Sequence, residues 1–198
     1  MSAADRALRA AVWDDDADAV RLALADGAEI ESRDEHRRTP LLIAAIGDHV
    51  AAAGALVAAG ADPDAQDDRE DSPWLVTGVT GSVRMMRVLL PAEPDLKLRN
   101  RFGGTALIPA AERGHVDYVR ALLRATDIDV DHVNRLGWTA LLEAVILGDG
   151  GQAHQEIVEL LITAGATPGL PDGDGMTALE HARRRGFTEI AGLLSALR

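Results

Sequence analysis

Short apolar segments alternate with polar, glycine-containing loops along the whole chain, and the same pattern returns about every 33 residues. Its clearest landmark is a Ser or Thr followed by Pro or Ala and then by a large apolar residue. The landmark recurs with spacings of 33, 33, 34 and 38 residues, at Thr39, Ser72, Thr105, Thr139 and Thr177, and a degenerate copy lies one period earlier, at Arg6. A repeat of this length predicts small stacked units, because no single unit can bury its apolar face alone.

The landmarks within one period predict a pair of helices and a hairpin loop. The Ser or Thr hydroxyl is suited to accept a backbone N–H bond at the start of a first helix, and Pro fits the first helical position. An aliphatic run later in the period predicts the second helix, and the Gly of a following Gly-Ala pair, as at Gly60, predicts its left-handed end. Asx-Gly turns, such as Asn134 to Gly137, then predict a projecting hairpin.

Together these elements predict an all-α solenoid of six helix-turn-helix units with projecting hairpin loops. We expect a single domain over residues 1–198, with units at approximately 4–36, 37–69, 70–102, 103–136, 137–174 and 175–198. The expected helix pairs are 4–13 with 17–25, 40–47 with 50–59, 73–79 with 83–91, 106–113 with 116–125, 140–147 with 153–163, and 178–185 with 188–196. The fifth unit carries a five-residue insertion within residues 148–155, between its two helices.

In this order and at this period the motifs resemble the ankyrin repeat, over nearly the full chain. Thr39-Pro40-Leu41-Leu42 stands where that family has its TPLH motif, with Leu42 in place of the usual His. The later copies also lack this His, and we expect aliphatic burial to compensate; they have Leu75, Ile108, Leu142 and Glu180. Residues 102–123 and 132–161 also resemble a group of small bacterial ankyrin repeat proteins. The resemblance implies a non-catalytic module that binds another protein at its hairpin tips and along the exposed side of its first helices.

Charge and composition narrow the class of partner. The chain has 20 Lys and Arg against 32 Asp and Glu, and its formal charge of −12 disfavours nucleic acid and anionic membrane surfaces. It has no cysteine, which excludes disulfides and thiolate zinc sites. The first residues lack the basic start and apolar run of a secretory signal, and no stretch has the apolar length that crosses a bilayer. We therefore expect a cytoplasmic protein, and the polar ends of the repeat row favour a monomer.

Cations gather around the hairpins that flank the fourth unit, whereas the hairpin at residues 64–71 is strongly acidic. The candidate binding residues among them are Arg99, Arg101, Arg113 and Arg135. Such a basic notch is suited to an acidic or phosphorylated segment of a partner protein. The alternative is that these arginines pair internally with neighbouring carboxylates, such as those of Asp95, Glu112 and Asp131.

Apolar residues also occur where the repeat predicts exposed positions. They are Phe102, Leu136, Trp138, Ile146 and Leu147. An apolar patch with charge at its rim is typical of a binding hot spot, in which Trp and Arg are enriched. The alternative is that Trp138 packs down the long loop of the fifth unit. Trp13, in the terminal unit, is expected to cover an edge of the core.

Catalytic or metal chemistry has little support in the sequence. His132, Asp149 and His154 are candidates to meet near the inserted loop, but their spacing matches no metal motif. The glycine-rich stretch 148–151 lacks the strand and the lysine of a phosphate-binding loop. We expect no catalytic residue, no metal and no cofactor. The alternative hypothesis is a metal- or ligand-dependent protein, or an enzyme, that uses the inserted loop.

Overall fold

The helices of this protein are gathered into two compact units. The computed structural model describes residues 2–196, and the chain divides between Arg101 and Phe102. Twelve α-helices, one short 3-10 helix and an isolated β-bridge between Pro171 and Thr177 make up the regular structure of residues 2–196. None of these helices combines the length and the apolar character needed to cross a lipid bilayer.

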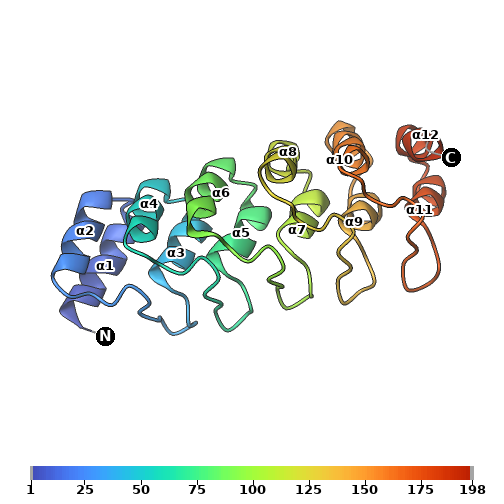
Figure 1. Ribbon diagram of the computed structural model, residues 1–198. Helices are drawn as coiled ribbons and strands as arrows, with labels where there is room; N and C mark the ends of the chain where they lie inside the picture. The colour runs from blue at the N-terminus through green and yellow to red at the C-terminus, as the bar shows by residue number, and fades with distance from the viewer. Residues whose placement is uncertain (1, 197–198) are drawn as a thin grey trace. The chain divides into compact units, whose positions relative to one another are not determined.

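The first unit holds three helix pairs in two layers (Figure 1). The pairs are α1 (Ala3–Trp13) with α2 (Ala17–Ala25), α3 (Pro40–Gly47) with α4 (Val50–Ala58), and α5 (Pro73–Thr80) with α6 (Val83–Leu89), which runs on into the 3-10 helix η1 (Leu90–Ala92). First helices pack on first helices, α1 on α3 and α3 on α5, while α2, α4 and α6 pack in the same order in the other layer. The connections between pairs project as hairpins below the first helices in Figure 1.

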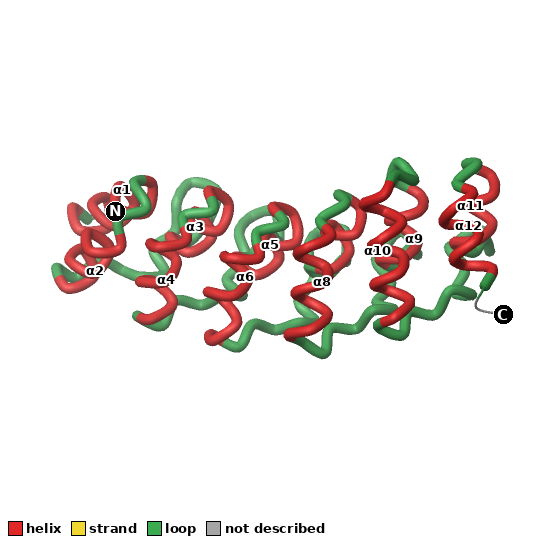
Figure 2. Tube along the Cα trace, turned by 90° about the horizontal axis from the view of Figure 1, so that it is seen from above, coloured by secondary structure: helices red, strands yellow, loops and turns green. Residues whose placement is uncertain are grey.

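The second unit repeats this arrangement with three further pairs. They are α7 (Leu107–Glu112) with α8 (Val116–Ala125), α9 (Ala140–Ile146) with α10 (Gln152–Thr163), and α11 (Ala178–Arg184) with α12 (Thr188–Ser195). Helix α9 packs between α7 and α11, and α10 packs between α8 and α12, as the view from above shows (Figure 2). All the helices predicted from the repeat are present, and their ends agree with the prediction to about two residues.

Hydroxyl caps start the first helices as the motif predicts, with one exception. The cap bond comes from the N–H three residues on, at 3.1 to 3.4 Å, at Thr39, Ser72, Thr139 and Thr177. The prediction is wrong at Thr105, whose buried hydroxyl has no hydrogen-bond partner among the described residues. Because Pro109 has no N–H for the Thr105 carbonyl, that carbonyl accepts the N–H of Ile108 instead, at 3.3 Å, and α7 starts only at Leu107.

The ends of the second helices follow the glycine pattern where glycine is present. Gly27, Gly60 and Gly165 have φ angles of 89°, 91° and 96°, which confirms the predicted left-handed ends. The third pair has no such glycine, so α6 continues into η1 and Glu93 takes the left-handed conformation, with φ 53°.

Aliphatic side chains fill the space between the two layers of each unit. The residues that replace the family's His in the TPLH motif are buried with at most 4% exposure, and they are Leu42, Leu75, Ile108 and Leu142. Burial of aliphatic side chains at these positions is therefore confirmed. Compensation by this burial for the hydrogen bonds that His would make stays a prediction. At the fifth equivalent position, Glu180 instead closes a capping box with Thr177 at the start of α11.

Candidate functional site

The hairpin before α9 is shaped by one side chain, that of Asn134. Its Oδ1 accepts the N–H groups of Leu136 and Trp138, at 2.9 and 3.0 Å, and its own N–H donates to the Trp138 carbonyl at 3.0 Å. Gly137 closes the turn with φ 79°. These bonds hold Arg135 and Leu136 at the tip of the hairpin, where both side chains are exposed.

Neighbouring hairpins of the second unit are joined at their tips. The N–H of Arg135 donates to the carbonyl of Phe102 at 2.9 Å. The Arg135 side chain also lies over Gly103, where an added Cβ would be only 2.8 Å from the Arg135 Cγ. The two apolar residues beside it remain largely exposed, with 52% of Phe102 and 55% of Leu136 accessible. We refer to Phe102, Arg135 and Leu136 as the hairpin patch.

Three other predicted site residues lie at the opposite ends of the first helices. Helices α7 and α9 pack side by side. Arg113 and Leu147 are their C-cap residues, and Ile146 is the last helical residue of α9. Leu147 is 49% exposed and Ile146 is partly buried. A seven-residue helix, roughly 10 Å long, separates this helix-end group (Arg113, Ile146 and Leu147) from the hairpin before α9.

A residue that sequence analysis missed, Arg185, supports the helix-end group. Its Nη1 donates to the carbonyls of Val145 and Ile146, and its guanidinium lies 4.6 Å from the ring centre of Phe187. Arg185 thus satisfies carbonyls that the end of α9 leaves without helical partners. The sequence carries no local signal for this role, because the carbonyls that Arg185 binds belong to α9, 39 and 40 positions earlier in the chain.

Trp138 lies between these two groups, directly before the capping residue of α9, and it is partly buried. The inserted loop is held by His154 and Phe187. His154 bonds through Nδ1 to Asp149, at 2.8 Å, and through Nε2 to the carbonyl of Glu112, at 2.9 Å. The ring of Phe187 lies so close over Gly150 that an added Cβ would be 2.4 Å from it. The loop is therefore fastened to residues of neighbouring repeats within the second compact unit.

The two remaining arginines of the predicted site belong to the first unit. Arg101 donates to the carboxylate of Asp71 at 3.4 Å, whereas the exposed Arg99 side chain has no bonding partner within residues 2–196. Burial raises the pKa of the Asp71 carboxyl, and Arg101 opposes that rise. Asp131, considered as an internal partner for the arginines, binds the N–H and hydroxyl of Thr167 instead, at 2.8 and 2.6 Å.

The candidates for metal binding are engaged in other contacts. His132 bonds to the carbonyl of Gly103 at 2.7 Å, while His154 is held by Asp149 and Glu112 as described above. In the part of the chain that the structure describes, no three His, Cys, Asp or Glu side chains are grouped so that they could hold a metal ion.

A buried carboxyl next to the hairpin was not predicted. Glu143, in α9, is 5% exposed and accepts a hydrogen bond of 2.7 Å from the amide of Asn134. Burial, with a smaller contribution from the charge of Glu112, raises the pKa of Glu143 to about 7. The signal was present in the repeat, because the equivalent positions in the three preceding first helices are the apolar residues Ile43, Val76 and Pro109.

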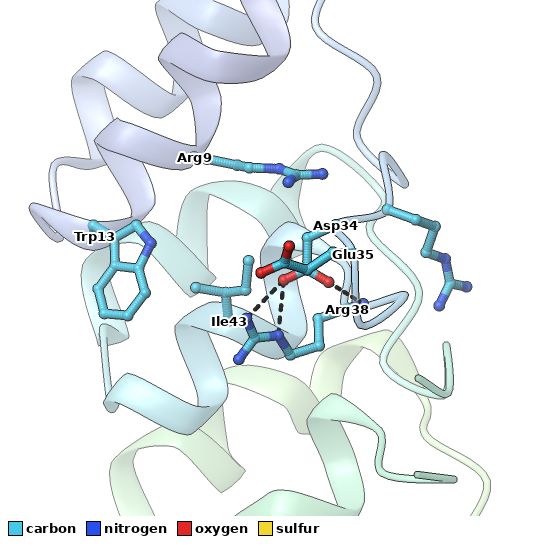
Figure 3. Close-up of a pocket in the computed structure, with 7 residues that line it drawn as sticks. Arg9, Trp13, Asp34, Glu35, Arg38 and Ile43 are labelled. Atoms are coloured by element: carbon cyan, nitrogen blue, oxygen red, sulfur yellow. Dashed lines mark hydrogen bonds and ion pairs between the residues drawn. The ribbon is translucent and has the colours of Figure 1, made fainter. Parts of the chain in front are cut away.

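The first unit contains a pocket that sequence analysis also missed. It lies between α1, α3 and the hairpin that joins the first two helix pairs (Figure 3). Trp13, expected to cover an edge of the core, instead lines this pocket and is 62% exposed. It packs edge-to-face against His49, with the ring centres 6.0 Å apart.

Comparison with known proteins agrees with the repeat structure. Residues 77–172 match a family model described as ankyrin repeats (3 copies), and residues 36–68 match one described as ankyrin repeat. The chain is 44% identical over 181 residues to an ankyrin repeat protein of Escherichia coli (strain K12), YahD. The match covers 91% of this chain and 90% of that protein.

Two solved structures extend the comparison to the fold. An ankyrin repeat domain from Acinetobacter baumannii AYE is 49% identical, with a TM-score of 0.91 and 96% of each chain covered. The ankyrin repeat domain of Bcl-3, a member of the IkappaB protein family, is 29% identical, with a TM-score of 0.85, and the match covers 96% of this chain and 85% of that domain.

Proposed function

Because the chain belongs to the ankyrin repeat family, we propose that it is a protein-interaction module that holds a partner segment against its hairpins and first helices, without catalysis. Ankyrin repeats are generally modules for binding other proteins. Such a module needs a rigid frame and exposed anchors, and the hairpins and first helices of each unit supply both.

The observation that supports this proposal most strongly is the hairpin patch. Two large apolar side chains, Phe102 and Leu136, are exposed on either side of the Arg135 backbone, which is tied to the Phe102 carbonyl. Apolar surface next to an arginine is the composition of a binding hot spot. The hydrogen bonds of Asn134 also order the hairpin before a partner arrives, which lowers the entropy that binding must remove.

Two arginines, Arg135 and Arg113, indicate the charge of the partner segment that would bind here. Arg135 lies in the hairpin patch, and the exposed Arg113 side chain has no hydrogen-bond or ion-pair partner within residues 2–196. We propose that acidic or phosphorylated residues of the partner meet these guanidinium groups while an apolar neighbour packs on Phe102 and Leu136. The further proposed contact residues are Arg99, Arg101, Trp138, Ile146 and Leu147.

The test is affinity capture from the native cell extract with three forms of the protein. These are the wild type, a Phe102→Ala/Leu136→Ala double variant, and a Leu22→Ala control. Leu22 is a matched control because it is 64% exposed but belongs to α2, in the layer of second helices.

A specific partner should be retained by the wild type and by Leu22→Ala and lost by the double variant, with no change in melting temperature. Equal retention by all three forms would show that the hairpin patch is not the binding surface. A screen that retains no specific protein on the wild type would contradict the proposed function itself.

A further inference from the structure

The pocket of the first unit has two kinds of wall. Its volume is about 610 Å³, and it is open to solvent. Arg9 and Trp13 reach it from α1, and Ile43 reaches it from α3 (Figure 3). The hairpin contributes charged residues, namely Arg33, Asp34, Glu35 and Arg38. An apolar wall of Trp13 and Ile43 thus faces a set of charges of both signs.

Two of the three arginines are committed to the fold. Arg38 donates through Nε and Nη2 to one oxygen of Asp34, each at 2.8 Å. The other oxygen of Asp34 accepts the N–H groups of His36 and Arg38, and these bonds keep the pKa of Asp34 low although burial opposes them. Arg33 donates to the carbonyls of Arg37 and Gln66, both at 2.7 Å. These bonds hold the hairpin in place.

Arg9 is different, because its guanidinium lacks an acceptor. Its Nε and Nη2 are buried, and neither has a hydrogen-bond partner among residues 2–196. Buried N–H groups without acceptors are costly, and a carboxylate, which accepts two hydrogen bonds side by side, is the natural partner of a guanidinium. The side chain crosses from α1 towards the hairpin and lines the pocket (Figure 3).

Glu35 is the one carboxylate of the pocket that is not held by the fold. Its side chain is 85% exposed, and one of its carboxylate oxygens lies 3.7 Å from the Nε2 of His36. Glu35 lies on the Arg9 side of the hairpin but forms no ion pair with it (Figure 3). Glu35 therefore leaves Arg9 without a carboxylate partner from the pocket. Its negative charge also opposes the approach of an anionic ligand.

We propose that this pocket binds an acidic residue of an extended protein segment, with the carboxylate on Arg9 and an adjacent apolar side chain on Trp13. The positive charge of Arg9 favours a carboxylate in the ligand. The indole of Trp13, which is 62% exposed, favours an apolar side chain next to that carboxylate. The choice of a protein segment as occupant rests on the proposed function. The pocket shares no residue with the hairpin patch, since all its residues belong to the first unit.

The experiment titrates isotopically labelled full-length protein with a terminally blocked heptapeptide that has one glutamate between two leucines. The readout is the indole N–H signal of Trp13, assigned from its loss in a Trp13→Phe variant. Parallel titrations use the same peptide with glutamine or with lysine in place of glutamate, and acetate alone. The protein variants are Arg9→Gln, Glu35→Gln and the control Arg21→Gln, which removes one exposed positive charge from α2.

The glutamate peptide should shift the Trp13 signal in a saturable way, and the glutamine and lysine peptides should bind much more weakly. Arg9→Gln should weaken the glutamate peptide about tenfold, and Glu35→Gln should strengthen it about two- to fivefold. Arg21→Gln should leave the affinity within about twofold of the wild type. Because Glu35 is exposed, its variant keeps the test decisive even if Arg9→Gln disturbs folding.

No saturable shift with the glutamate peptide, equal binding of the glutamine peptide, or tighter binding of the lysine peptide would overturn the proposal. Acetate that saturates the site at the same concentration as the peptide would also overturn it, because the pocket would then hold a small anion only. Failure here is distinguishable from failure of the proposed function, which is tested through Phe102 and Leu136 in the other unit.

Discussion

The amide of Asn134 donates a hydrogen bond of 2.7 Å to the carboxyl group of Glu143, and this bond links the hairpin tip to a buried position on α9. The remaining polar groups of Asn134 shape the hairpin that presents Arg135 and Leu136. A titratable group in the core of the second unit therefore supports the backbone of the hairpin patch. The stability of this region should depend on the charge of Glu143.

Stability should fall as the pH rises through the titration of Glu143. Its pKa in the folded protein is about 7, against an ordinary value of 4.5, so the folded state binds the proton more tightly than the unfolded state. The contribution of protonated Glu143 to the free energy of unfolding is complete below about pH 4.5, and it is lost as the pH approaches and passes about 7. Glu143→Gln keeps an acceptor for Asn134 and should raise the unfolding free energy at pH 8 by about 2–3 kcal/mol.

Urea unfolding of both forms at pH 5 and pH 8 measures this effect. Only the difference between the two forms is informative, because other carboxyl groups also titrate in this range. A gap between wild type and Glu143→Gln that is the same at both pH values would show that Glu143 titrates normally.

Asn134→Asp should destabilise the protein, although aspartate stands at the equivalent position of three other hairpins. Asp34, Asp67 and Asp172 occupy the equivalent position and accept the same two N–H bonds. At position 134 an aspartate would bring a second negative charge against Glu143 and remove the amide donor. We expect a loss of about 2–3 kcal/mol at pH 8 that becomes smaller at pH 5. Thermal melts at the two pH values measure it.

Adding Glu143→Gln to Asn134→Asp should recover most of that loss, because the glutamine amide can donate to the new carboxylate. A double variant as unstable as Asn134→Asp alone would refute the charge argument.

The same substitution should have opposite effects at two equivalent threonines. Thr105 has a buried hydroxyl without a partner, so Thr105→Val should stabilise the protein by about 1 kcal/mol. Thr139 caps α9 at 3.2 Å, so Thr139→Val should destabilise it by about 1 kcal/mol. Chemical denaturation of the two variants tests the assignment. Destabilisation of both by similar amounts would mean that Thr105 also caps its helix.

Two glycines with left-handed backbone should differ in their tolerance of alanine. Gly60 has φ 91° and open space around it, so Gly60→Ala should cost about 1 kcal/mol from backbone strain. Gly150 has φ 73° and lies against the Phe187 ring, so Gly150→Ala should cost about 2–4 kcal/mol. Thermal melts should therefore rank Gly150→Ala well below Gly60→Ala. Equal melting temperatures would show that Phe187 does not pack on the inserted loop.

The parts of the fold that could be predicted are those that depend on interactions between residues close together in the sequence. A capping hydroxyl, an aliphatic run and a glycine act on their own neighbours within one period, so Thr39, Thr139 and Gly60 behave as their motif predicts. Thr105 breaks the rule for an equally local reason, the missing N–H of Pro109, which the repeat alignment alone did not reveal.

The candidate site was predicted only in part, because exposure and pairing depend on residues from other repeats. Phe102 and Leu136 are exposed as expected, but Arg101 pairs with Asp71, 30 positions away, and His154 bonds to a carbonyl 42 positions away. Arg185 reaches carbonyls 39 and 40 positions back along the chain. No spacing rule within a repeat identifies these partners.

The amino-acid sequence by itself determined the number of helix pairs, most of their starts and ends and the repeat family, since these follow from a local pattern repeated along the chain. Only the tertiary structure decided that Asn134 bonds to Glu143, that Arg9 lacks an acceptor and that Trp13 stays exposed. The physical reason is that burial and pairing are properties of the space between neighbouring repeats, to which residues distant in the chain contribute.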